Sequence, residues 1–490
     1  MSTVSVTRAD LADADLIRPG DHDVVVGLFS GPDGVRGGRG AALAGDALGV
    51  DVVAVASTDP DFDGTRSART VAVVTGPAGT TRLVLVGLGE HPASPATLFD
   101  AAVAANVARP STSTLAAEAN GALGAVALGH ALGAWRYRRE PGVPAPTVPV
   151  TLVDAGVADG TAEAVLARAA VIARVTGWVR QLVEAPPNTL RPNEFADAVS
   201  ALAGELAPES VVVEAWDEAT LKALGFGATL AVGAGSVHSP LVVELRLTGD
   251  GPTTALAGKG ITFDSGGVNL KRDAGELSWM KSDMAAAASV AAAVIAAAAL
   301  GRSASVVAIL PVAENMPGGS ALRPGDVVTH PGGRTTEVLD TDCEGRLVLA
   351  DALGYLSGQR PERIVDVGTL FDSGALGTAY WGCWSNVAGV ATDLVDAGVR
   401  AFDPGWALPL HPTYLALLSS RVADVANAPA DAPDSSLVAA TYLSTFVGDV
   451  PWVHVDNGSA AWLERDAYPW PAGATGTPLR ALLEFLHPGP

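Results

Sequence analysis

Apolar runs of strand length alternate with Ala-rich stretches over the first third of the chain. The runs are rich in Val and Leu, which favours β-strands, whereas residues 115–135 have the composition of a helix. An alternation of strands and helices is typical of a layered α/β domain. The predicted strands of this region are residues 23–29, 50–56, 69–74, 81–89 and 149–153.

The same alternation continues after a helical pattern at residues 161–183. Helical patterns separate several of the later runs, which favours a second, largely parallel sheet. We therefore expect an α/β fold with a smaller N-terminal domain, residues 1–165, and a larger C-terminal domain, residues 166–490, on a mixed, largely parallel central sheet. The predicted strands of the second domain are residues 210–216, 228–235, 241–247, 253–260, 304–312 and 363–370.

Charge and cysteine content restrict the partners and the compartment. The 490 residues include 31 basic and 53 acidic ones, a formal charge of -22. This charge opposes binding to nucleic acid and to anionic membranes, so neither is an expected partner. Only Cys343 and Cys383 are present, and the first residues lack the apolar core of a signal peptide, which favours the cytoplasm. The apolar residues 284–300 are short for a membrane span and mostly Ala, so we interpret them as a buried helix.

Several common catalytic motifs are absent from the sequence. The loops at residues 87–92 and 233–238 lack the third Gly of a dinucleotide-binding loop. Lys259 is followed by Gly260, where a phosphate-binding loop has Ser or Thr. No Ser lies in a G-x-S-x-G elbow, and the eight His residues form no H-E-x-x-H pair. Serine hydrolase and His-based zinc protease chemistry are therefore disfavoured.

A cluster of acids precedes an apolar run near the middle of the second domain. Residues 338–355 read VLDTDCEGRLVLADALGY and place Asp340, Asp342 and Glu344 within five positions. In an extended segment these alternate residues point the same way, so they repel one another unless a cation lies among them. The alternative is that they only cap the helix that begins near Leu347.

A second stretch supplies lysines and further acids. Residues 257–290 read AGKGITFDSGGVNLKRDAGELSWMKSDMAAAASV and contain Lys259, Asp264, Lys271 and Asp283. Functional loops of open α/β sheets gather at the carboxyl ends of strands, so the two stretches can meet in one crevice. Four or five carboxylates gathered there require divalent cations. Taken singly, Asp283 as a helix cap, Asp264 as the start of a D-S-G-G turn and the lysines as surface charges remain alternatives.

These two stretches resemble the leucyl aminopeptidase family, the M17 dinuclear-metal cytosol aminopeptidases. The resemblance lies in GKGITFDSGG, MKSDM and TDCEGRLVLADAL, and it continues in the same order at residues 182–198, 313–328, 422–429 and 473–486. The first third of the chain matches the family only in its α/β character. The resemblance implies a metalloaminopeptidase, with its active site in the C-terminal domain, that releases N-terminal amino acids from peptides through a hydroxide activated by two metal ions.

The resemblance also implies the metal ligands. Mapped residue by residue, the tighter ion is held by Lys259, Asp264, Asp283 and Glu344, and the more exchangeable ion by Asp264, Asp342 and Glu344. Asp264 and Glu344 would then bridge the two ions. Lys259 ligates only as a neutral amine, so the metal and the surrounding burial must lower its pKa.

The remaining roles implied by the resemblance are catalytic. Lys271 would donate to the oxyanion of the tetrahedral intermediate, and Arg346 would anchor a bicarbonate that carries the proton. The implied cofactors are two divalent ions per subunit, Mn or Zn, and bicarbonate at Arg346. The implied partners are peptides with a free N-terminal amine and further copies of the chain in a homohexamer.

The chain departs from the family pattern near the site. It has one residue more between Lys271 and Asp283, Ala285-Ala286 in place of Gly-Gly, and an altered substrate loop at residues 369–375. In that loop Phe371 adds bulk and Asp372 adds charge, which predicts a weakened preference for an N-terminal Leu. The alternatives to a general aminopeptidase are a narrow-specificity dipeptidase or aminoacyl-amide hydrolase, and a catalytically weak family member with a binding or scaffold role.

Overall fold

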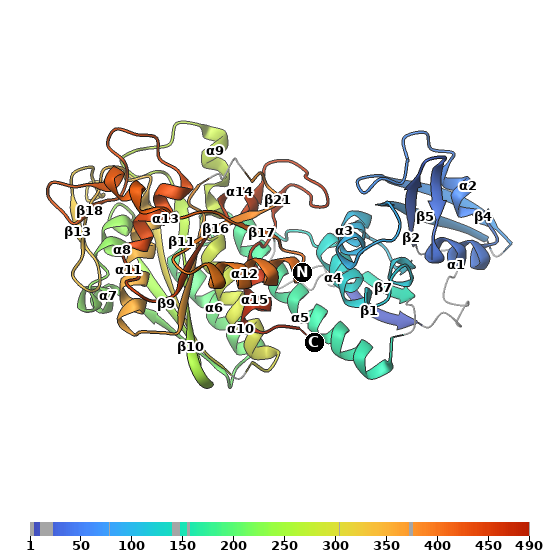
Figure 1. Cartoon of the computed structure of the whole chain (residues 1–490), viewed down its shortest axis with the longest axis horizontal. Coiled ribbons are helices and arrows are strands. Elements are labelled where there is room, and N and C mark those ends of the chain that lie inside the picture. Colours follow the sequence, from blue (N-terminus) through green and yellow to red (C-terminus); the bar gives the residue numbers. More distant parts are fainter. Residues whose placement is uncertain are drawn as a thin grey trace. The chain divides into compact units, whose positions relative to one another are not determined.

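The structure, a computed structural model, describes residues 4–9, 23–77, 79–139, 148–153, 157–302, 304–371 and 376–489 (Figure 1). The chain forms two compact units, residues 1–177 with 465–472 and residues 178–464 with 473–490. The division falls inside helix α5 (Asp159–Glu184), which also contains the domain boundary expected near residue 165. Each unit has its own central sheet.

The N-terminal unit is built on a seven-stranded sheet among its described residues, in the order β1-β7-β6-β2-β5-β4, with β3 paired to β2. Its inner strands are parallel, and β4 closes one edge antiparallel to β5. The strands are β1 (Val4–Ala9), β2 (Asp23–Gly31), β3 (Gly34–Gly37), β4 (Arg69–Gly76), β5 (Gly79–Gly89), β6 (Ser111–Ser113) and β7 (Val148–Val153). The helices are α1 (Arg39–Leu48), α2 (Val52–Ala56), α3 (Pro95–Ala105), η2 (Leu115–Ala117) and α4 (Leu123–Gly133).

One strand predicted in this unit, residues 50–56, is wrong, because the segment forms helix α2. The side chain of Asp51 caps the helix by accepting a hydrogen bond from the backbone N–H of Ala54 at 3.0 Å. Val52 and Ala56, about one helical turn apart, are buried, whereas Ala54 is exposed. The four valines of the run favoured a strand by composition, but the buried face follows the helical period.

A buried histidine is expected to make the N-terminal unit sensitive to acid. His130 on α4 is fully buried, its Nε2 lies 2.9 Å from Ser113 Oγ, and burial lowers its pKa to about 3. Below about pH 6.5 the unfolded chain binds a proton on this ring that the folded unit does not bind, so stability falls with the pH down to about 3.

We expect this histidine to make the free energy of unfolding fall by up to about 1.4 kcal/mol per pH unit below pH 6.5. Replacing His130 by Gln removes the titrating group and is expected to flatten that dependence. Urea unfolding between pH 7 and pH 4.5 measures both slopes. Equal slopes in the two proteins would contradict the assignment.

The C-terminal unit is built on a nine-stranded sheet among its described residues, in the order β17-β16-β19-β15-β10-β12-β9-β8, with β11 paired to β12. The central strands β19, β15, β10 and β12 are parallel, and antiparallel pairs lie toward both edges. The predicted mixed, largely parallel sheet is therefore confirmed. Its strands are β8 (Val211–Trp216), β9 (Leu241–Leu247), β10 (Asp250–Gly258), β11 (Gly260–Asp264), β12 (Ala304–Asn315), β15 (Arg363–Gly368), β16 (Trp381–Ser385), β17 (Gly405–Ala407) and β19 (Trp452–Asp456).

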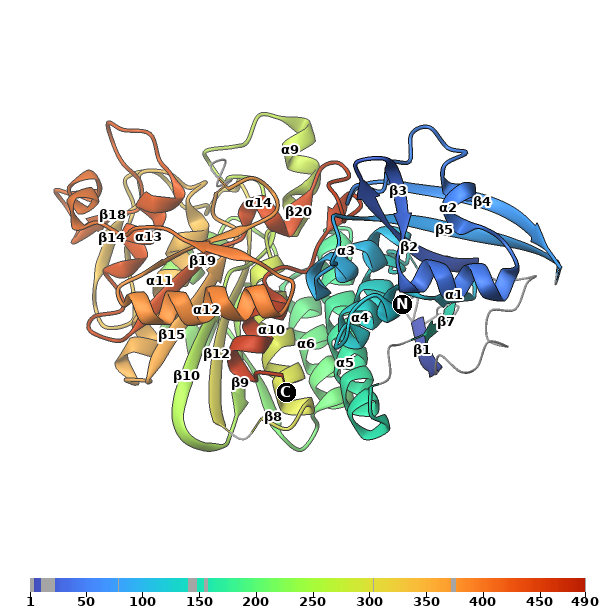
Figure 2. The same cartoon turned by 45° about the vertical axis from the view of Figure 1, so that its right-hand side comes forward.

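Helices cover both faces of this sheet (Figure 2). On one face α10 packs with α6 and α15, and on the other α11 packs with α8 and α13. Two small sheets, β13-β14-β18 and β20-β21, complete the described part of the unit. These elements are α6 (Pro192–Leu206), α7 (Glu218–Leu224), α8 (Gly227–Gly233), α9 (Ala274–Trp279), η3 (Met280–Ser282), α10 (Ala285–Ala299), α11 (Glu344–Gly358), α12 (Ala388–Arg400), η4 (Pro412–Leu418), α13 (Ser436–Ser444), α14 (Gly458–Ala461), α15 (Leu479–Leu486), β13 (Val327–Thr329), β14 (Thr335–Glu337), β18 (Val425–Ala426), β20 (Trp462–Leu463) and β21 (Gly473–Ala474).

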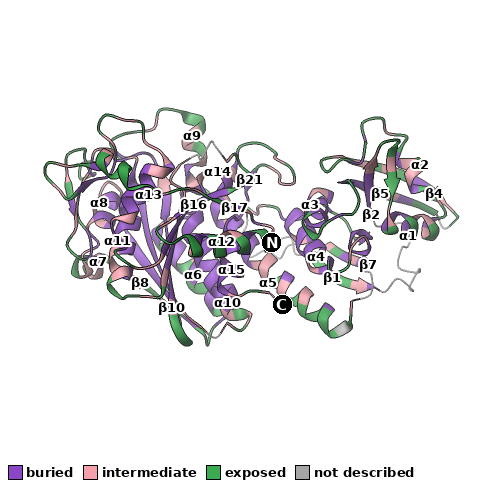
Figure 3. Cartoon of the chain, viewed as in Figure 1, coloured by how far each residue is buried: buried purple, intermediate pink, exposed green. Residues whose placement is uncertain are grey.

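Helix α10 forms part of the interior of this unit (Figure 3). The segment Ala274–Ala299 is apolar and long enough to cross a membrane by length and composition, but 89% of an apolar 18-residue window within it is buried in the fold. The prediction of a buried helix is confirmed. Its Ala residues allow a close approach to the sheet, where the backbone N–H of Ala287 donates to the carbonyl of Lys259 at 2.9 Å.

A second predicted strand, residues 228–235, is also wrong, because the segment lies largely in helix α8. Thr229 donates to Asp351 Oδ2 twice, from its backbone N–H at 2.7 Å and from its hydroxyl at 2.9 Å. Asp351 belongs to α11, so these bonds attach α8 to the helix that carries Glu344. The local pattern of apolar residues could not predict this tertiary contact.

Candidate metal centre

The side chains singled out in the sequence meet at the carboxyl ends of the central strands, the end at which α9 lies (Figure 1). Lys259 lies between β10 and β11, and Asp264 ends β11. Asp283 follows η3 and lies two residues before the start of α10, while Glu344 begins α11, two residues after Asp342. The additional residue between Lys271 and Asp283 lies in a segment that contains α9 and η3.

A glycine turn after β11 brings the two stretches together. Gly266 and Gly267 have φ angles of 85° and 67°, in the left-handed region that favours glycine. The N–H of Gly266 donates to Asp264 Oδ1 at 2.8 Å. A Cβ atom on Gly266 would lie 3.0 Å from Asp342 Oδ1 and 2.5 Å from the carbonyl oxygen of Asn269, so a side chain does not fit here. The D-S-G-G sequence therefore permits the close approach of Asp264 and Asp342.

Lys259 lies at the centre of one half of the site. Its Nζ lies 2.8 Å from Asp283 Oδ1 and 2.8 Å from Glu344 Oε1, and it donates to the Thr369 carbonyl at 2.8 Å. Burial lowers the pKa of this amine, but Asp283, Glu344 and Asp264 outweigh burial and raise it above its ordinary value. Ligation as a neutral amine therefore needs the positive charge of a bound ion, which opposes the field of the carboxylates.

Lys271 occupies the other half of the site. Its Nζ lies 2.6 Å from Asp342 Oδ1 and 3.1 Å from Asp264 Oδ2. Burial lowers its pKa, but Asp264, Glu344 and Asp342 outweigh this effect and raise it. Lys271 is therefore a cation that touches the acids of both stretches.

The four acids carry more negative charge than the two lysines balance. Burial, and then the neighbouring carboxylates, raise the pKa of Asp342 to about 7 and that of Glu344 above its usual range. The pKa of Asp283 is raised as well, first by burial, although Lys259 opposes the rise. Among the described residues, Asp283 Oδ2 and Glu344 Oε2 are buried and have no hydrogen-bond partner. Buried carboxylate oxygens are normally paired, so these atoms indicate a missing positive ligand.

A divalent cation fits this arrangement. Asp264, Asp342 and Glu344 each offer an oxygen, and these oxygens lie within 4.8 Å of one another. Oxygen-rich sites with a nitrogen ligand suit ions such as Mn or Zn. Asp340 has a different place, because one of its oxygens accepts the backbone N–H of Asp342 at 2.9 Å. Asp340 therefore lies beside the cluster and is not one of the residues that offer it a ligand oxygen.

A bicarbonate ion at Arg346 does not fit. The buried guanidinium donates from Nη2 to Asp434 Oδ2 at 2.7 Å and from Nη1 to Asp434 Oδ1 at 3.3 Å. Nη1 also donates to the carbonyl of Asn427 at 2.7 Å. A side-chain carboxylate of the protein thus binds the guanidinium that the sequence resemblance assigned to bicarbonate.

Several residues that position the centre were not assigned to it in the sequence analysis, although one of them, Thr369, begins the predicted substrate loop. Thr369 donates to Asp283 Oδ1 at 2.6 Å, and Asn315 donates to Asp264 Oδ1 at 2.8 Å. Asp456 accepts the backbone N–H groups of Leu370 and Phe371 at 3.2 and 3.4 Å. Asn315 and Asp456 end buried strands as Asp264 does, and this position was a usable signal.

The predicted substrate loop is described only in part. Phe371 lies against Arg346, whose guanidinium carbon is 5.6 Å from the centre of its ring. Asp372 and the rest of the altered segment, residues 372–375, lie outside the described residues. The bulk of Phe371 is thus placed beside the Arg346–Asp434 pair.

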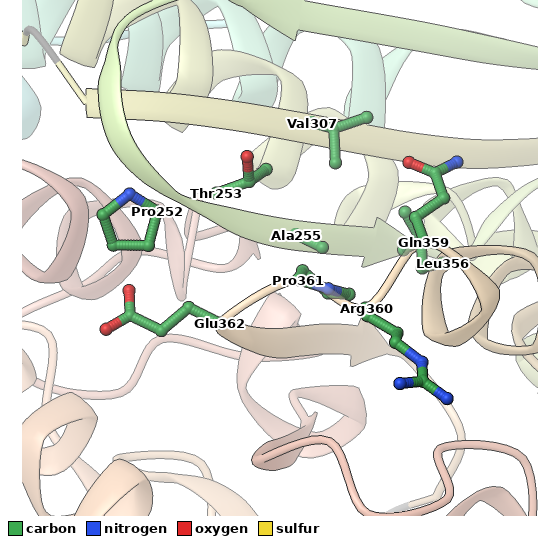
Figure 4. Close-up of a pocket in the computed structure, with 9 residues that line it drawn as sticks. All are labelled: Pro252, Thr253, Ala255, Val307, Leu356, Gln359, Arg360, Pro361 and Glu362. Atoms are coloured by element: carbon green, nitrogen blue, oxygen red, sulfur yellow. The ribbon is translucent and has the colours of Figure 1, made fainter.

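A cavity of about 340 Å³ lies near the amino ends of β10 and β15 (Figure 4). Its lining includes Pro252 and Thr253 near the start of β10 and Glu362 just before β15. The metal-centre residues instead follow the carboxyl ends of the strands and are not part of its described lining. The cavity is therefore separate from the candidate centre.

Comparisons with known proteins identify the family to which the chain is similar. Residues 177–483 match the model of the cytosol aminopeptidase family, catalytic domain. A probable cytosol aminopeptidase of Leifsonia xyli is 41% identical over 393 residues, 76% of this chain and 78% of that protein. A probable cytosol aminopeptidase of Micrococcus luteus is 38% identical over 498 residues, 95% of each chain.

A solved structure is similar over nearly the whole chain. The bottromycin maturation enzyme BotP in complex with Mn has a TM-score of 0.80 and 34% identity, and the match covers 95% of this chain and 99% of that chain. The family model covers more than half of the chain, and it includes the carboxylates and lysines of the centre. The chain therefore belongs to the cytosol aminopeptidase family and is a metal-dependent aminopeptidase.

Proposed function

We propose that this enzyme releases N-terminal amino acids from peptides at a centre of two divalent ions. One ion would be held by Lys259, Asp264, Asp283 and Glu344, and the other by Asp264, Asp342 and Glu344. The observation that carries the proposal is the convergence of four acids on two lysines, with buried carboxylate oxygens of Asp283 and Glu344 unpaired among the described residues. Clustered buried carboxylates of this kind are stabilised when divalent cations bind between them.

The side chains have separate tasks in this proposal. When bound, the two ions supply Lewis-acid activation of water and of the substrate carbonyl, and a contact for the free amine. Lys271 donates to the oxygen on which negative charge develops, as a preorganised cation. Asp456 and Thr369 position the segment that faces Asp283 and Lys259. The ligands are thus fixed by hydrogen bonds before substrate binds.

The metal, assembly and compartment are part of the proposal. Manganese is favoured over zinc because the similar BotP structure is a complex with Mn. The names of the relatives support a cytoplasmic location, and the family resemblance supports a homohexamer and peptide substrates. The description of BotP as a maturation enzyme favours one alternative, an enzyme with a narrow substrate range.

Metal removal and a substrate panel test the proposal. Purified protein is expected to contain two divalent ions per chain by elemental analysis, and exhaustive chelation is expected to abolish hydrolysis of aminoacyl amides. Adding Mn or Zn restores turnover, because the carboxylates and lysines remain in place. The panel compares kcat/KM for Leu, Ala, Gly, Arg and Lys amides with their N-acetylated forms.

Each outcome has a separate meaning. Turnover of free-amine substrates alone supports an aminopeptidase, and a preference other than Leu supports the predicted effect of the altered loop. Turnover confined to one dipeptide or amide supports the narrow enzyme. Full activity at verified zero metal content overturns the dinuclear proposal, and inactivity of the metal-loaded enzyme on every free-amine substrate favours a scaffold role.

A further inference from the structure

The carboxylate of Asp434 is held by four donors at the edge of the metal centre. Arg346 donates to both of its oxygens, as described above, in a two-point geometry that favours carboxylates. The backbone N–H of Ser435 donates to Oδ1 at 2.8 Å, and the thiol of Cys343 donates to Oδ2 at 3.2 Å. The Asp434 side chain is 18% exposed, against 1% for Arg346. A carboxylate with this many donors has a fixed position.

The position is next to the segment that carries two metal ligands. Cys343 stands between Asp342 and Glu344 in the sequence, and its sulfur contacts Asp434 directly. Arg346 follows Glu344 on the first turn of α11. Asp434 itself comes from a different segment, the loop that precedes α13. The fold therefore brings an additional acid to the segment of the proposed ligands from about ninety residues away. Helix capping and turn formation, the alternatives considered for the other acids, do not explain the position of Asp434.

We propose that Asp434 replaces bicarbonate at Arg346, so that this enzyme carries its own proton-transferring carboxylate and uses no bicarbonate. The inference rests on the proposed aminopeptidase function. A free anion would have to compete with a tethered carboxylate for the same guanidinium, and it would lie against the negative charge of Asp434. The tethered group is also present at a high effective concentration, which a dissolved ion does not reach.

In the proposed reaction Asp434 both accepts and returns the proton that hydrolysis transfers. The attacking water loses a proton as its oxygen bonds to the carbonyl carbon, and Asp434 accepts this proton as a carboxylate. The leaving nitrogen receives the proton from Asp434 as the C–N bond breaks. Asp434 ends each cycle ionised, and no further base is consumed.

Three variants test the inference in the metal-loaded, full-length enzyme. Assays use bicarbonate-free buffer under argon and the same buffer with added bicarbonate. Asp434→Ala empties the place beside Arg346, Asp434→Asn fills it with a group that accepts no proton, and Asp431→Ala removes an exposed acid of the same loop as a matched control. The wild-type enzyme and Asp431→Ala are expected to have equal kcat with and without bicarbonate.

The two Asp434 variants are expected to differ in rescue. Both lose about a hundredfold in kcat or more without bicarbonate, the usual range for a lost acid–base group. Added bicarbonate is expected to raise the kcat of Asp434→Ala at least tenfold, because the Arg346 guanidinium can then bind it. It is expected to leave the kcat of Asp434→Asn unchanged. Circular dichroism and metal content establish that each variant is folded and loaded.

Binding of ¹³C-labelled bicarbonate, followed by NMR line broadening, gives a readout that does not depend on turnover. We expect binding to Asp434→Ala and none to the wild type. The inference is overturned by bicarbonate stimulation of the wild type, by bicarbonate binding to the wild type, by normal kcat in Asp434→Ala, or by a loss in that variant without rescue. If the wild type turns over no free-amine substrate, the proposed function fails, and the NMR experiment still decides which anion occupies Arg346.

Discussion

Replacing Glu344 by Gln is expected to abolish peptide hydrolysis. Glu344 is 1% exposed, its Oε1 lies 2.8 Å from Lys259 Nζ, and its Oε2 is unpaired among the described residues. In the proposed centre this carboxylate would be a ligand of both ions, so replacing it by a neutral amide would weaken the binding of both. We expect kcat/KM to fall by at least about a thousandfold, which corresponds to about 4 kcal/mol of transition-state stabilisation.

The same substitution is expected to remove the stabilisation by metal. An ion that binds only the folded protein raises the free energy of unfolding by about 2.7 kcal/mol at one hundred times its dissociation constant. Wild-type protein is expected to show such a rise on titration with Mn, and Glu344→Gln is expected to show little or none at the same concentrations. Thermal unfolding and elemental analysis of the dialysed protein measure this effect without reference to turnover.

A matched control separates ligation from a general change in charge. Glu276 on α9 lies 3.8 Å from Lys271 Nζ, is 44% exposed, and lies outside the cluster of ligand oxygens. Glu276→Gln makes the same chemical change a short distance away and is expected to keep both ions and nearly normal turnover. Two ions and wild-type kcat/KM in Glu344→Gln would refute the ligand assignment.

The alternation of strands and helices was sufficient to predict a mixed, largely parallel sheet in the catalytic unit, although it did not identify the central strand β19. Buried parallel strands are nearly continuous apolar runs, and this signal identified β10, β12 and β15. It failed at α2 and α8, where short runs of Val and Ala are compatible with either period. At α8 the deciding interaction is the pair of bonds from Thr229 to Asp351 on another helix, which no local window contains.

The candidate site was predictable to the extent that its residues are close in sequence. Asp264 and Lys271 share one loop, and Asp342, Glu344 and Arg346 share one turn into a helix. The side chains that complete the arrangement come from distant segments. Thr369, Asp456 and Asp434 each approach the centre only because the sheet and the α13 loop bring them there. Their roles depend on tertiary distances, so the sequence resemblance placed a dissolved anion where the fold supplies Asp434.

Replacing Lys271 by Met is expected to separate catalysis from metal binding. The Nζ of Lys271 lies between Asp264 and Asp342, so removing its charge leaves their oxygens more available to a cation. Both ions are therefore expected to remain. If Lys271 donates to the developing oxyanion, kcat falls about 10²–10³-fold, or about 2.7–4 kcal/mol, while KM changes little.

The matched control for this prediction is Lys281→Met, which removes a partly buried lysine from the same connection between β11 and α10. Its Nζ donates to the carbonyl of Glu184 at 2.8 Å and lies over the ring of Trp462, outside the cluster of acids. We expect the control to keep kcat within about threefold, since it makes no transition-state contact. Steady-state kinetics on a Leu or Ala amide, with elemental analysis of the same samples, measures both variants. A Lys271→Met enzyme that keeps its kcat would exclude the oxyanion role, and one that loses its ions would show that Lys271 holds the ligands in place rather than the transition state.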